Sequence, residues 1–199
     1  MVVFGITGGS GSGKTSVSKM LEKLGVHIID TDVIAHEIVE PNSDCLNELV
    51  DYFGDSILND DKTLNRKKLA SIAFSDKQKT EALSNITHKY IKAEVVKDIN
   101  TTDAELVGID GAVIIGSNVE PLCEFIVSVI ADKQSRITRI KTRDNITDEQ
   151  AIQRINAQND DEFYKENSMY IIYNNGDIAQ LEIDIGVAIL HPDGQNRLN

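Results

Sequence analysis

Large aromatic side chains and cysteines are scarce in this sequence. The 199 residues include no tryptophan, and aromatic residues make up only 5% of the chain, so the core is expected to rest on Ile, Val and Leu. The two cysteines, Cys45 and Cys123, lie far apart and form no pair of metal ligands. A disulfide-stabilised secreted domain is therefore excluded, and we interpret both cysteines as reduced thiols of a cytoplasmic protein.

An excess of basic charge and long hydrophobic runs are also absent. The formal net charge of −12 argues against a nucleic-acid partner, because clustered Lys and Arg hold a phosphate backbone. A small phosphorylated ligand needs only a local basic pocket and stays possible. The segment Met1–Ile6 lacks the basic residues and the length of a signal peptide. We expect neither secretion nor a membrane contact.

Five short apolar runs have the length and composition of buried β-strands. Helical stretches separate them, which predicts an α/β protein with a doubly wound parallel sheet and right-handed crossovers. The chain length suits one domain. The predicted strands are Val2–Ile6, Val26–Ile29, Glu105–Ile109, Phe125–Ala131 and Tyr170–Tyr173.

Two helical segments extend beyond this alternating pattern. Residues 34–100 are mostly helical in pattern and too numerous for one crossover helix, so we expect a helical insertion that covers the substrate. The run Thr147-Asp148-Glu149-Gln150 is a capping box and predicts a helix from there towards Gln158. Residues 191–199 are rich in Pro, Gly, Asn and Asp and are expected to form a frayed tail.

The segment Gly8–Thr15 fits the pattern G-x-x-x-x-G-K-T in full, after a predicted strand and before a predicted helix. Glycines allow the backbone to approach a phosphate closely, so that amide N–H groups point at the anion. The following helix adds its positive N-terminal end. These features predict a phosphate-loop (P-loop) NTPase-type fold that binds ATP through Gly9, Gly11, Ser12, Gly13, Lys14, Thr15 and Ser16.

Two side chains of this loop have distinct expected roles. Lys14 would reach the β- and γ-phosphates as a mobile positive charge. Thr15 would offer its hydroxyl to Mg²⁺, which uses few protein ligands and keeps several waters. Asp110 ends a predicted strand, where phosphate-loop enzymes place a carboxylate near that ion. The loop predicts the donor but not the acceptor.

The acceptor is expected to be a small molecule, since the guanine-selective pattern Asn-Lys-x-Asp is absent. Asp30 and Asp32 stand two residues apart at the end of a predicted strand, so their side chains should leave on one face. A carboxylate at this edge of the sheet can orient a hydroxyl towards the γ-phosphate. The alternative is that one of them caps a helix beginning near Val33.

Three arginines are spaced by three and four residues and would share one face of a helix. A basic stripe of this kind can close on the transferring phosphate and exclude water, which predicts a helical lid over residues 136–160. The alternative is a solvated surface face, because Lys133 and Lys141 lie nearby. The stripe consists of Arg136, Arg139 and Arg143.

In combination, these segments resemble the dephospho-CoA kinase family. The family carries T-G-G-x-x-S-G-K-S/T, then D-A-D-x-x-A with V-x-P, an L-x-R-x-x-L-x-x-x-x-F stretch, an R-x-x-x-R-D lid, a later Gln and a final N-x-G. The matching segments run along nearly the whole chain: Thr7–Thr15, Asp30–Ala35, Val39–Pro41, Leu64–Phe74, Arg139–Asp144, Gln158 and Asn174–Gly176.

The resemblance implies an ATP-dependent kinase that phosphorylates the ribose 3′-hydroxyl of dephospho-CoA, the last step of coenzyme A biosynthesis. It places the family's catalytic base at Asp32 and its lid arginine at Arg143. Lys14 completes the expected catalytic set. The expected substrate-binding residues are Asp32, Arg66, His88, Asp110 and Arg139.

Several positions depart from the family pattern and leave other functions open. Ala112-Val113-Ile114 stands where P-L-L is expected, and Thr31, Lys89, Gly116 and Tyr164 also differ. A nucleoside or nucleotide kinase on the same scaffold is one alternative. An ATP-binding regulatory protein that has lost phosphoryl transfer is another. The sequence predicts no oligomeric state.

Overall fold

The computed structural model describes residues 1–176 together with residues 181 and 186, so the expected tail at 191–199 lies outside the described residues. The chain divides into two compact units. The phosphate-loop unit comprises Met1–Ile29 and the described residues from Thr102 onwards, and the helical unit comprises Asp30–Thr101.

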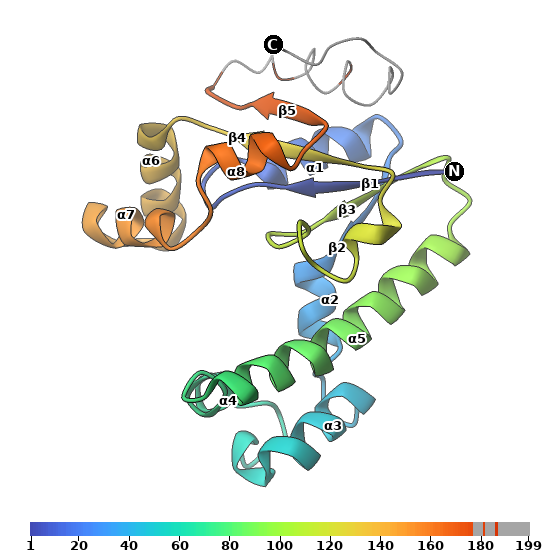
Figure 1. Cartoon of the computed structure of the whole chain (residues 1–199), viewed down its shortest axis with the longest axis vertical. Coiled ribbons are helices and arrows are strands. Elements are labelled where there is room, and N and C mark those ends of the chain that lie inside the picture. Colours follow the sequence, from blue (N-terminus) through green and yellow to red (C-terminus); the bar gives the residue numbers. More distant parts are fainter. Residues whose placement is uncertain (177–180, 182–185, 187–199) are drawn as a thin grey trace. The chain divides into compact units, whose positions relative to one another are not determined.

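The phosphate-loop unit is built on a five-stranded sheet with the order β2-β3-β1-β4-β5 (Figure 1). β1 pairs in parallel with β3 on one side and with β4 on the other, and β4 pairs in parallel with β5. The predicted doubly wound α/β fold is therefore confirmed, with strand ends displaced by one residue at most. The strands are β1 (Val2–Thr7), β2 (His27–Asp30), β3 (Leu106–Asp110), β4 (Phe125–Ile130) and β5 (Tyr170–Tyr173).

The central strands are buried on both faces, which explains their continuous apolar sequences. Every residue of β4 is buried, as are the last five residues of β1. Some of the few aromatic residues pack here, whereas others, such as Phe74, are exposed. The rings of Phe4 and Phe125 stack with centroids 5.3 Å apart, and Tyr170 meets Phe125 edge-on at 5.4 Å. The core thus uses aromatic side chains as well as the expected aliphatic ones.

Among the described residues, the helices that accompany the sheet are α1 (Lys14–Lys23), α6 (Lys133–Asp144), α7 (Asp148–Asn156) and α8 (Asp161–Glu166). A short 3₁₀ helix, η2 (Glu120–Leu122), precedes β4. The predicted capping box is confirmed, because the Thr147 hydroxyl accepts from the Gln150 N–H and the Gln150 side chain accepts from the Thr147 N–H. α6 and α7 pack through a small apolar cluster of Ile137, Ile140, Ala151 and Ile155.

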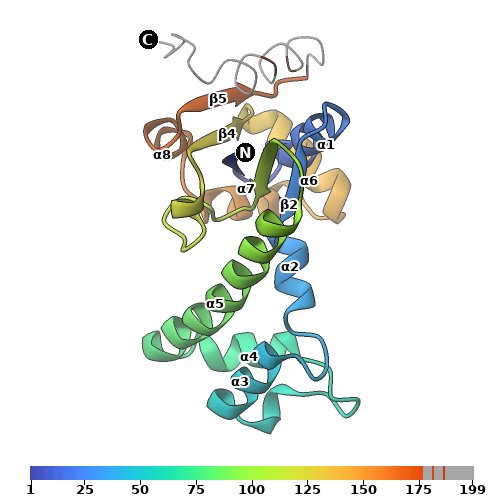
Figure 2. The ribbon, with the colours of Figure 1, turned by 90° about the vertical axis from the view of Figure 1, so that its right-hand side faces the viewer.

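The helical unit contains α2 (Thr31–Glu37), α3 (Asp44–Phe53), the 3₁₀ helix η1 (Asp55–Ile57), α4 (Arg66–Ala73) and the long α5 (Lys77–Thr101). α5 contacts α2, α3 and α4, so the other α-helices of the unit all pack against it (Figure 2). The unit spans nearly the same residues as the expected insertion at 34–100. Its role in covering a substrate stays a prediction.

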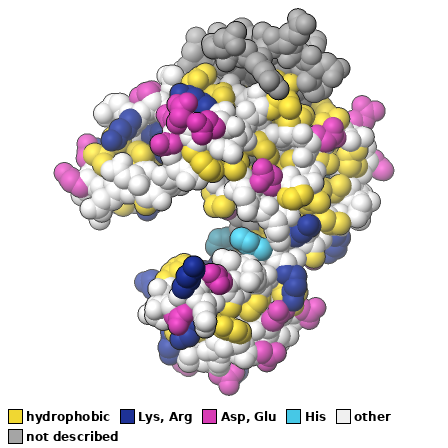
Figure 3. All heavy atoms as spheres, in the orientation of Figure 1, with side chains coloured by type: hydrophobic (Ala, Val, Ile, Leu, Met, Phe, Trp, Pro, Cys, Tyr) yellow, Lys and Arg dark blue, Asp and Glu magenta, His cyan; other side chains and the backbone are white. Residues whose placement is uncertain are grey.

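On the face shown in Figure 3, acidic and basic side chains are interspersed rather than gathered in one patch of a single charge. Within the described residues, no helix combines the length and apolar character needed to cross a membrane.

Candidate active site

The loop between β1 and α1 has the backbone of an anion-binding turn. Gly11 and Gly13 take φ angles of 78° and 92°, which a residue with a Cβ rarely adopts. Gly13 is the N-cap of α1 and contributes no capping side chain. The Ser16 N–H donates to the Gly13 carbonyl at 2.9 Å, which leaves the N–H groups of Lys14 and Thr15 for a ligand at the positive end of the helix. Thr15 and Ser16, in this first turn, are exposed.

The Ser12 hydroxyl supports an anionic ligand at this loop. Ser12 is only 1% exposed, and its Oγ has no hydrogen-bond partner among the described residues. A buried hydroxyl without a partner costs free energy, so native structures seldom contain one. A phosphate oxygen in the loop would accept this hydrogen bond.

Asp110 lies beside the loop at the end of β3 and is 3% exposed. Its carboxylate forms an ion pair with the Lys14 ammonium and accepts a hydrogen bond of 2.6 Å from the Ser18 hydroxyl. Ser18 follows Lys14 by four residues, so both side chains leave α1 on the same face. Ser18 was not predicted from the sequence, although its spacing from Lys14 on the helix is a signal that could have revealed it. The pairing of Lys14 with Asp110 is a finding of the structure, since the sequence predicts a role for each residue and no contact between them.

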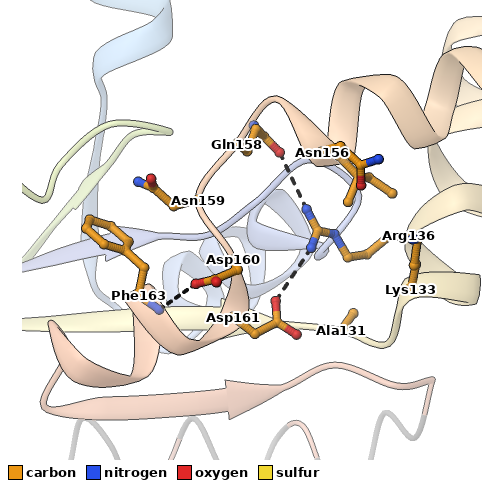
Figure 4. A pocket seen from close by; sticks show the side chains of 10 residues that line it. Ala131, Lys133, Arg136, Asn156, Gln158, Asn159, Asp160, Asp161 and Phe163 are labelled. Atoms are coloured by element: carbon orange, nitrogen blue, oxygen red, sulfur yellow. Dashed lines mark hydrogen bonds and ion pairs between the residues drawn. The ribbon is translucent and has the colours of Figure 1, made fainter.

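The three arginines of α6 have different environments. Arg136 is 6% exposed, and its Nε donates a hydrogen bond of 2.9 Å to the Ser10 carbonyl. Its other nitrogens face the Gln158 amide oxygen at 3.4 Å and the Asp161 carboxylate at 3.5 Å (Figure 4). The surface alternative is therefore wrong for Arg136, because the phosphate loop covers its guanidinium.

Arg139 also binds the backbone of the loop. Its Nη1 donates to the carbonyls of Gly11 and Ser12, both at 3.1 Å, and its Nη2 donates to the Asn174 carbonyl at 2.9 Å. The Asn174 side chain adds a hydrogen bond of 2.9 Å from Nδ2 to the Ser12 carbonyl. Arg139, a predicted substrate-binding residue, thus contacts the loop itself, and the surface alternative is wrong for it too.

Arg143 differs from the other two arginines. Its side chain is 60% exposed, and its Nε and Nη2 donate to the Asp144 carboxylate at 2.8 and 2.9 Å. Arg154 of α7 forms an ion pair with the same carboxylate. The hydrogen bonds from Arg143 hold the pKa of Asp144 below its usual range. The expected basic stripe is therefore divided between a buried and an exposed part, and the catalytic role of Arg143 stays a prediction.

Two of the cavities formed by the described residues lie beside Gln158, which contacts the phosphate loop. The larger, about 690 Å³, lies among α6, α7 and α8 and is lined by residues that include Arg136, Gln158 and Asp161 (Figure 4). The smaller, about 230 Å³, is lined by residues that include Thr7, Ala112 and Tyr164. Ala112 and Tyr164 both depart from the family pattern, so two of these departures meet at one cavity.

The predicted catalytic carboxylate Asp32 lies in the helical unit. β2 ends at Asp30 and α2 begins at Thr31, so Asp32 stands exposed in the first turn of a helix. The expectation that Asp30 and Asp32 leave a strand on the same face is wrong, because the strand ends at Asp30. The capping alternative is confirmed for Asp30, whose carboxylate accepts from the N–H groups of Asp32 at 2.8 Å and Val33 at 3.0 Å.

The other predicted residues of the helical unit are placed on separate helices. Arg66 is the first residue of α4, next to the N-cap Asn65, and is exposed. His88 is half-buried on α5. Their contacts with a substrate therefore stay predictions.

The structure offers oxygen donors of the kind that Mg²⁺ prefers, the Thr15 hydroxyl and the Asp110 carboxylate. Within residues 1–176, 181 and 186, no group of three His, Cys, Asp or Glu side chains could enclose a metal by itself. These donors fit a magnesium ion that binds together with the phosphates of a nucleotide.

The two cysteines are free thiols in the structure. Burial raises the pKa of the Cys45 thiol to about 11 and that of Cys123 to about 12. Neither therefore has the depressed pKa of a catalytic thiol.

Comparison with known proteins identifies relatives over most of the chain. The family model for dephospho-CoA kinase matches residues 2–180. A dephospho-CoA kinase from Lactobacillus johnsonii is 35% identical over 181 residues, which cover 89% of this chain and 91% of the relative. One from Corynebacterium efficiens is 36% identical over 186 residues, which cover 91% and 92%.

Solved structures share the fold. A dephospho-CoA kinase from Campylobacter jejuni superposes with a TM-score of 0.65 at 25% identity, covering 94% of this chain and 95% of its own. A shikimate kinase from Bacteroides thetaiotaomicron gives a TM-score of 0.55 at 17% identity, covering 97% and 99%, and so supports the fold alone.

Proposed function

This chain belongs to the dephospho-CoA kinase family, and we propose that it transfers the γ-phosphoryl group of ATP to the ribose 3′-hydroxyl of dephospho-CoA. The observation that carries the proposal is the complete phosphate loop Gly8–Thr15, in a chain that matches the family from residue 2 to residue 180. The reaction is the final step of coenzyme A biosynthesis, which we place in the cytoplasm.

The donor side of the site binds the triphosphate of ATP. The proposed ligands are the backbone N–H groups around Gly9, Gly11, Ser12 and Gly13, the N-terminal end of α1 with Thr15 and Ser16, and the Lys14 ammonium. In the free protein the Lys14 ammonium forms an ion pair with the Asp110 carboxylate. Binding of ATP would offer Lys14 a second anionic partner, and Lys14 would stabilise the charge on the transferring group.

Thr15 and Asp110 are proposed to hold Mg²⁺, Thr15 through its hydroxyl and Asp110 from a second shell. When bound, the ion would neutralise charge on the β- and γ-phosphates. Asp110 is also proposed to position Lys14, because a buried carboxylate fixes the ammonium that it pairs with.

The acceptor side is proposed to lie with Asp32, Arg66 and His88. Asp32 would accept a hydrogen bond from the ribose 3′-hydroxyl and receive its proton as the oxygen bonds to the γ-phosphorus, while the bond from that phosphorus to the β,γ-bridging oxygen breaks and ADP leaves. Because phosphoryl transfer passes through a loose transition state, orienting the hydroxyl contributes more than removing its proton early. The exposure of Asp32 in the free protein supports its access to a substrate. Arg66 and His88 would bind the rest of the acceptor.

Arg143 is proposed to stabilise charge on the transferring phosphate. To do so it must exchange its contact with Asp144 for one with the phosphate. Its 60% exposure supports this exchange, since an exposed ion pair is weak and easily broken. Arg139 is proposed as a substrate-binding residue by the same resemblance, in addition to its contacts with the loop.

An assay of acceptor choice tests the proposal. Turnover of ATP would be measured with dephospho-CoA, adenosine, AMP and uridine, and the position of the new phosphate determined by NMR of the product. We expect turnover with dephospho-CoA and a 3′-phosphate in its product. Turnover with another acceptor in preference, or ATP binding without transfer to any of the four, would overturn the proposal.

A further inference from the structure

We propose that four side chains fix the phosphate loop in its ligand-binding conformation by holding the outer side of its backbone. These anchor residues are Arg136, Arg139, Gln158 and Asn174. They act as positioning residues and need not touch the nucleotide. The inference rests on the proposed function only in that the loop binds a nucleoside triphosphate.

The contacts of the anchor residues converge on three consecutive residues of the loop. The carbonyl groups of Ser10, Gly11 and Ser12 accept hydrogen bonds from Arg136, from Arg139, and from Arg139 together with Asn174. The Ser10 N–H donates to Gln158 Oε1 at 2.7 Å. The anchor residues thus hold three successive carbonyls and one amide of a loop that makes few hydrogen bonds of its own.

Peptide geometry turns these contacts into an orientation of the amide groups. In a trans peptide the C=O group and the following N–H group point in opposite directions, and the described residues contain no cis peptide. Holding the carbonyls of Ser10 and Ser12 therefore directs the N–H groups of Gly11 and Gly13 away from the anchor residues. The Ser12 N–H is used within the loop, where it donates to the Gly9 carbonyl at 3.1 Å.

The burial of Arg136 favours a specific structural role. A guanidinium that is 6% exposed is tolerated only where it has several partners. Arg136 has three, namely the Ser10 carbonyl, the Gln158 amide oxygen and the Asp161 carboxylate (Figure 4). Because Gln158 Oε1 also accepts from the Ser10 N–H, Arg136 and Gln158 together bind both backbone polar groups of Ser10.

The anchor residues also explain why particular positions of the loop are glycine. A Cβ at Gly9 would overlap the Arg136 guanidinium, and one at Gly13 would overlap the Asn174 amide. A Cβ at Gly11 would lie 2.7 Å from the Arg136 carbonyl oxygen. The glycines therefore allow close contact with the anchor residues on one side of the loop as well as with phosphates on the other.

Two substitutions of Gln158 test the proposal, since both of its contacts use Oε1 and a carboxylate can replace that acceptor. ATP affinity would be measured by calorimetry, and kcat and KM by assay. We expect Gln158→Leu to raise the Kd for ATP by about tenfold, the effect of losing hydrogen bonds to a backbone amide and a guanidinium. We expect Gln158→Glu to stay within about twofold of the wild type. If neither variant bound ATP more weakly than the wild type, or if both lost the same affinity, the proposal would be overturned.

Arg136→Ala supplies a second test, with Lys141→Ala as the matched control on the same helix. Lys141 forms its ion pair with Asp148 of α7 rather than with the loop. We expect Arg136→Ala to weaken ATP binding by at least about tenfold, and added guanidinium ion to restore part of the affinity. Lys141→Ala should keep wild-type affinity with or without guanidinium. Wild-type affinity in Arg136→Ala contradicts the proposal, and if this variant does not fold, the Gln158 pair decides.

These outcomes separate the inference from the proposed function. The readout is ATP binding, which does not depend on the acceptor. A wild-type protein that binds no ATP would refute the proposed function. A wild-type protein that binds ATP no better than folded Gln158→Leu would refute only the anchoring role.

Discussion

The two ends of α6 carry arginines with the same helical spacing but opposite environments. At the N-terminal end, Arg136 is 6% exposed and Arg139 half-buried, and both donate to the backbone of the phosphate loop. At the C-terminal end, Arg143 is 60% exposed and pairs with a carboxylate that two cations share. The spacing places these side chains on one face of α6. The segments of the protein that pack around each arginine decide what it contacts.

The difference indicates two kinds of function for one stripe. A buried cation with several fixed partners is suited to holding a structure, because breaking its contacts would leave a desolvated charge. An exposed cation with one partner is suited to changing partners during a reaction, because little free energy holds it.

The buried ion pair at the loop should be the most sensitive position. We expect Lys14→Met to lower kcat/KM by at least about 10³-fold, because it removes the ammonium that stabilises the transferring group and with it the ion pair to Asp110. Lys19→Met, at an exposed position of the same helix, should change kcat/KM less than twofold. Steady-state kinetics compare the two variants. Undiminished use of ATP by Lys14→Met would remove the basis of the proposed function.

Asp32 tests whether an exposed carboxylate can still be essential. We expect Asp32→Asn to lower kcat by about 10²–10⁴-fold while the Kd for ATP changes less than twofold, since the loss concerns the acceptor hydroxyl. Asp30→Asn is the matched control, because asparagine also caps a helix and should preserve α2. Turnover at the wild-type rate in Asp32→Asn would exclude it as the base.

Arg143 tests the exposed end of the stripe. We expect Arg143→Ala to lower kcat by about 10²-fold and to raise KM much less, as for an interaction formed late on the reaction path. Arg154→Ala removes the other cation on Asp144 and should leave kcat nearly unchanged. If only KM changed in Arg143→Ala, this arginine would bind the substrate rather than stabilise the transition state.

The smallest effect should come from Asp144, whose ion pairs are at the surface. We expect Asp144→Asn to lower the Tm at pH 7 by less than about 2 °C. The folded-state pKa of Asp144 is lowered from 3.8, mainly by the hydrogen bonds from Arg143, so its contribution is present above about pH 4 and is lost as the pH falls further. Thermal unfolding at pH 7 and pH 3 measures this. A difference that grows towards low pH would contradict the assignment.

Local sequence patterns predicted much of the donor site. The loop Gly8–Thr15, the strand that ends at Asp110 and the capping box at Thr147 each depend on neighbours within a few residues. The pairing of Lys14 with Asp110, which are 96 positions apart, follows once β1 and β3 are adjacent in the sheet. Such features are accessible to sequence reasoning because their physics is local or follows from the order of the strands.

The errors arose where a side chain had more than one possible partner. The spacing predicts Asp30 and Asp32 on one strand face, but Asp30 is the last residue of β2 and the N-cap of α2, and its carboxylate accepts from two N–H groups of the first turn. The roles of Gln158, Asn174 and Arg136 in holding the loop were not predicted. Their contacts join residues between 126 and 162 positions apart, and no periodic pattern encodes them.

The sequence alone determined the class of fold, the phosphate loop and the family. This was possible because backbone freedom at glycine, helix capping and strand burial each depend on a short segment of residues. Only the tertiary structure decided which arginines of α6 are buried and which is exposed. The physical reason is desolvation: the cost of burying a guanidinium depends on partners that the folded chain brings from distant positions.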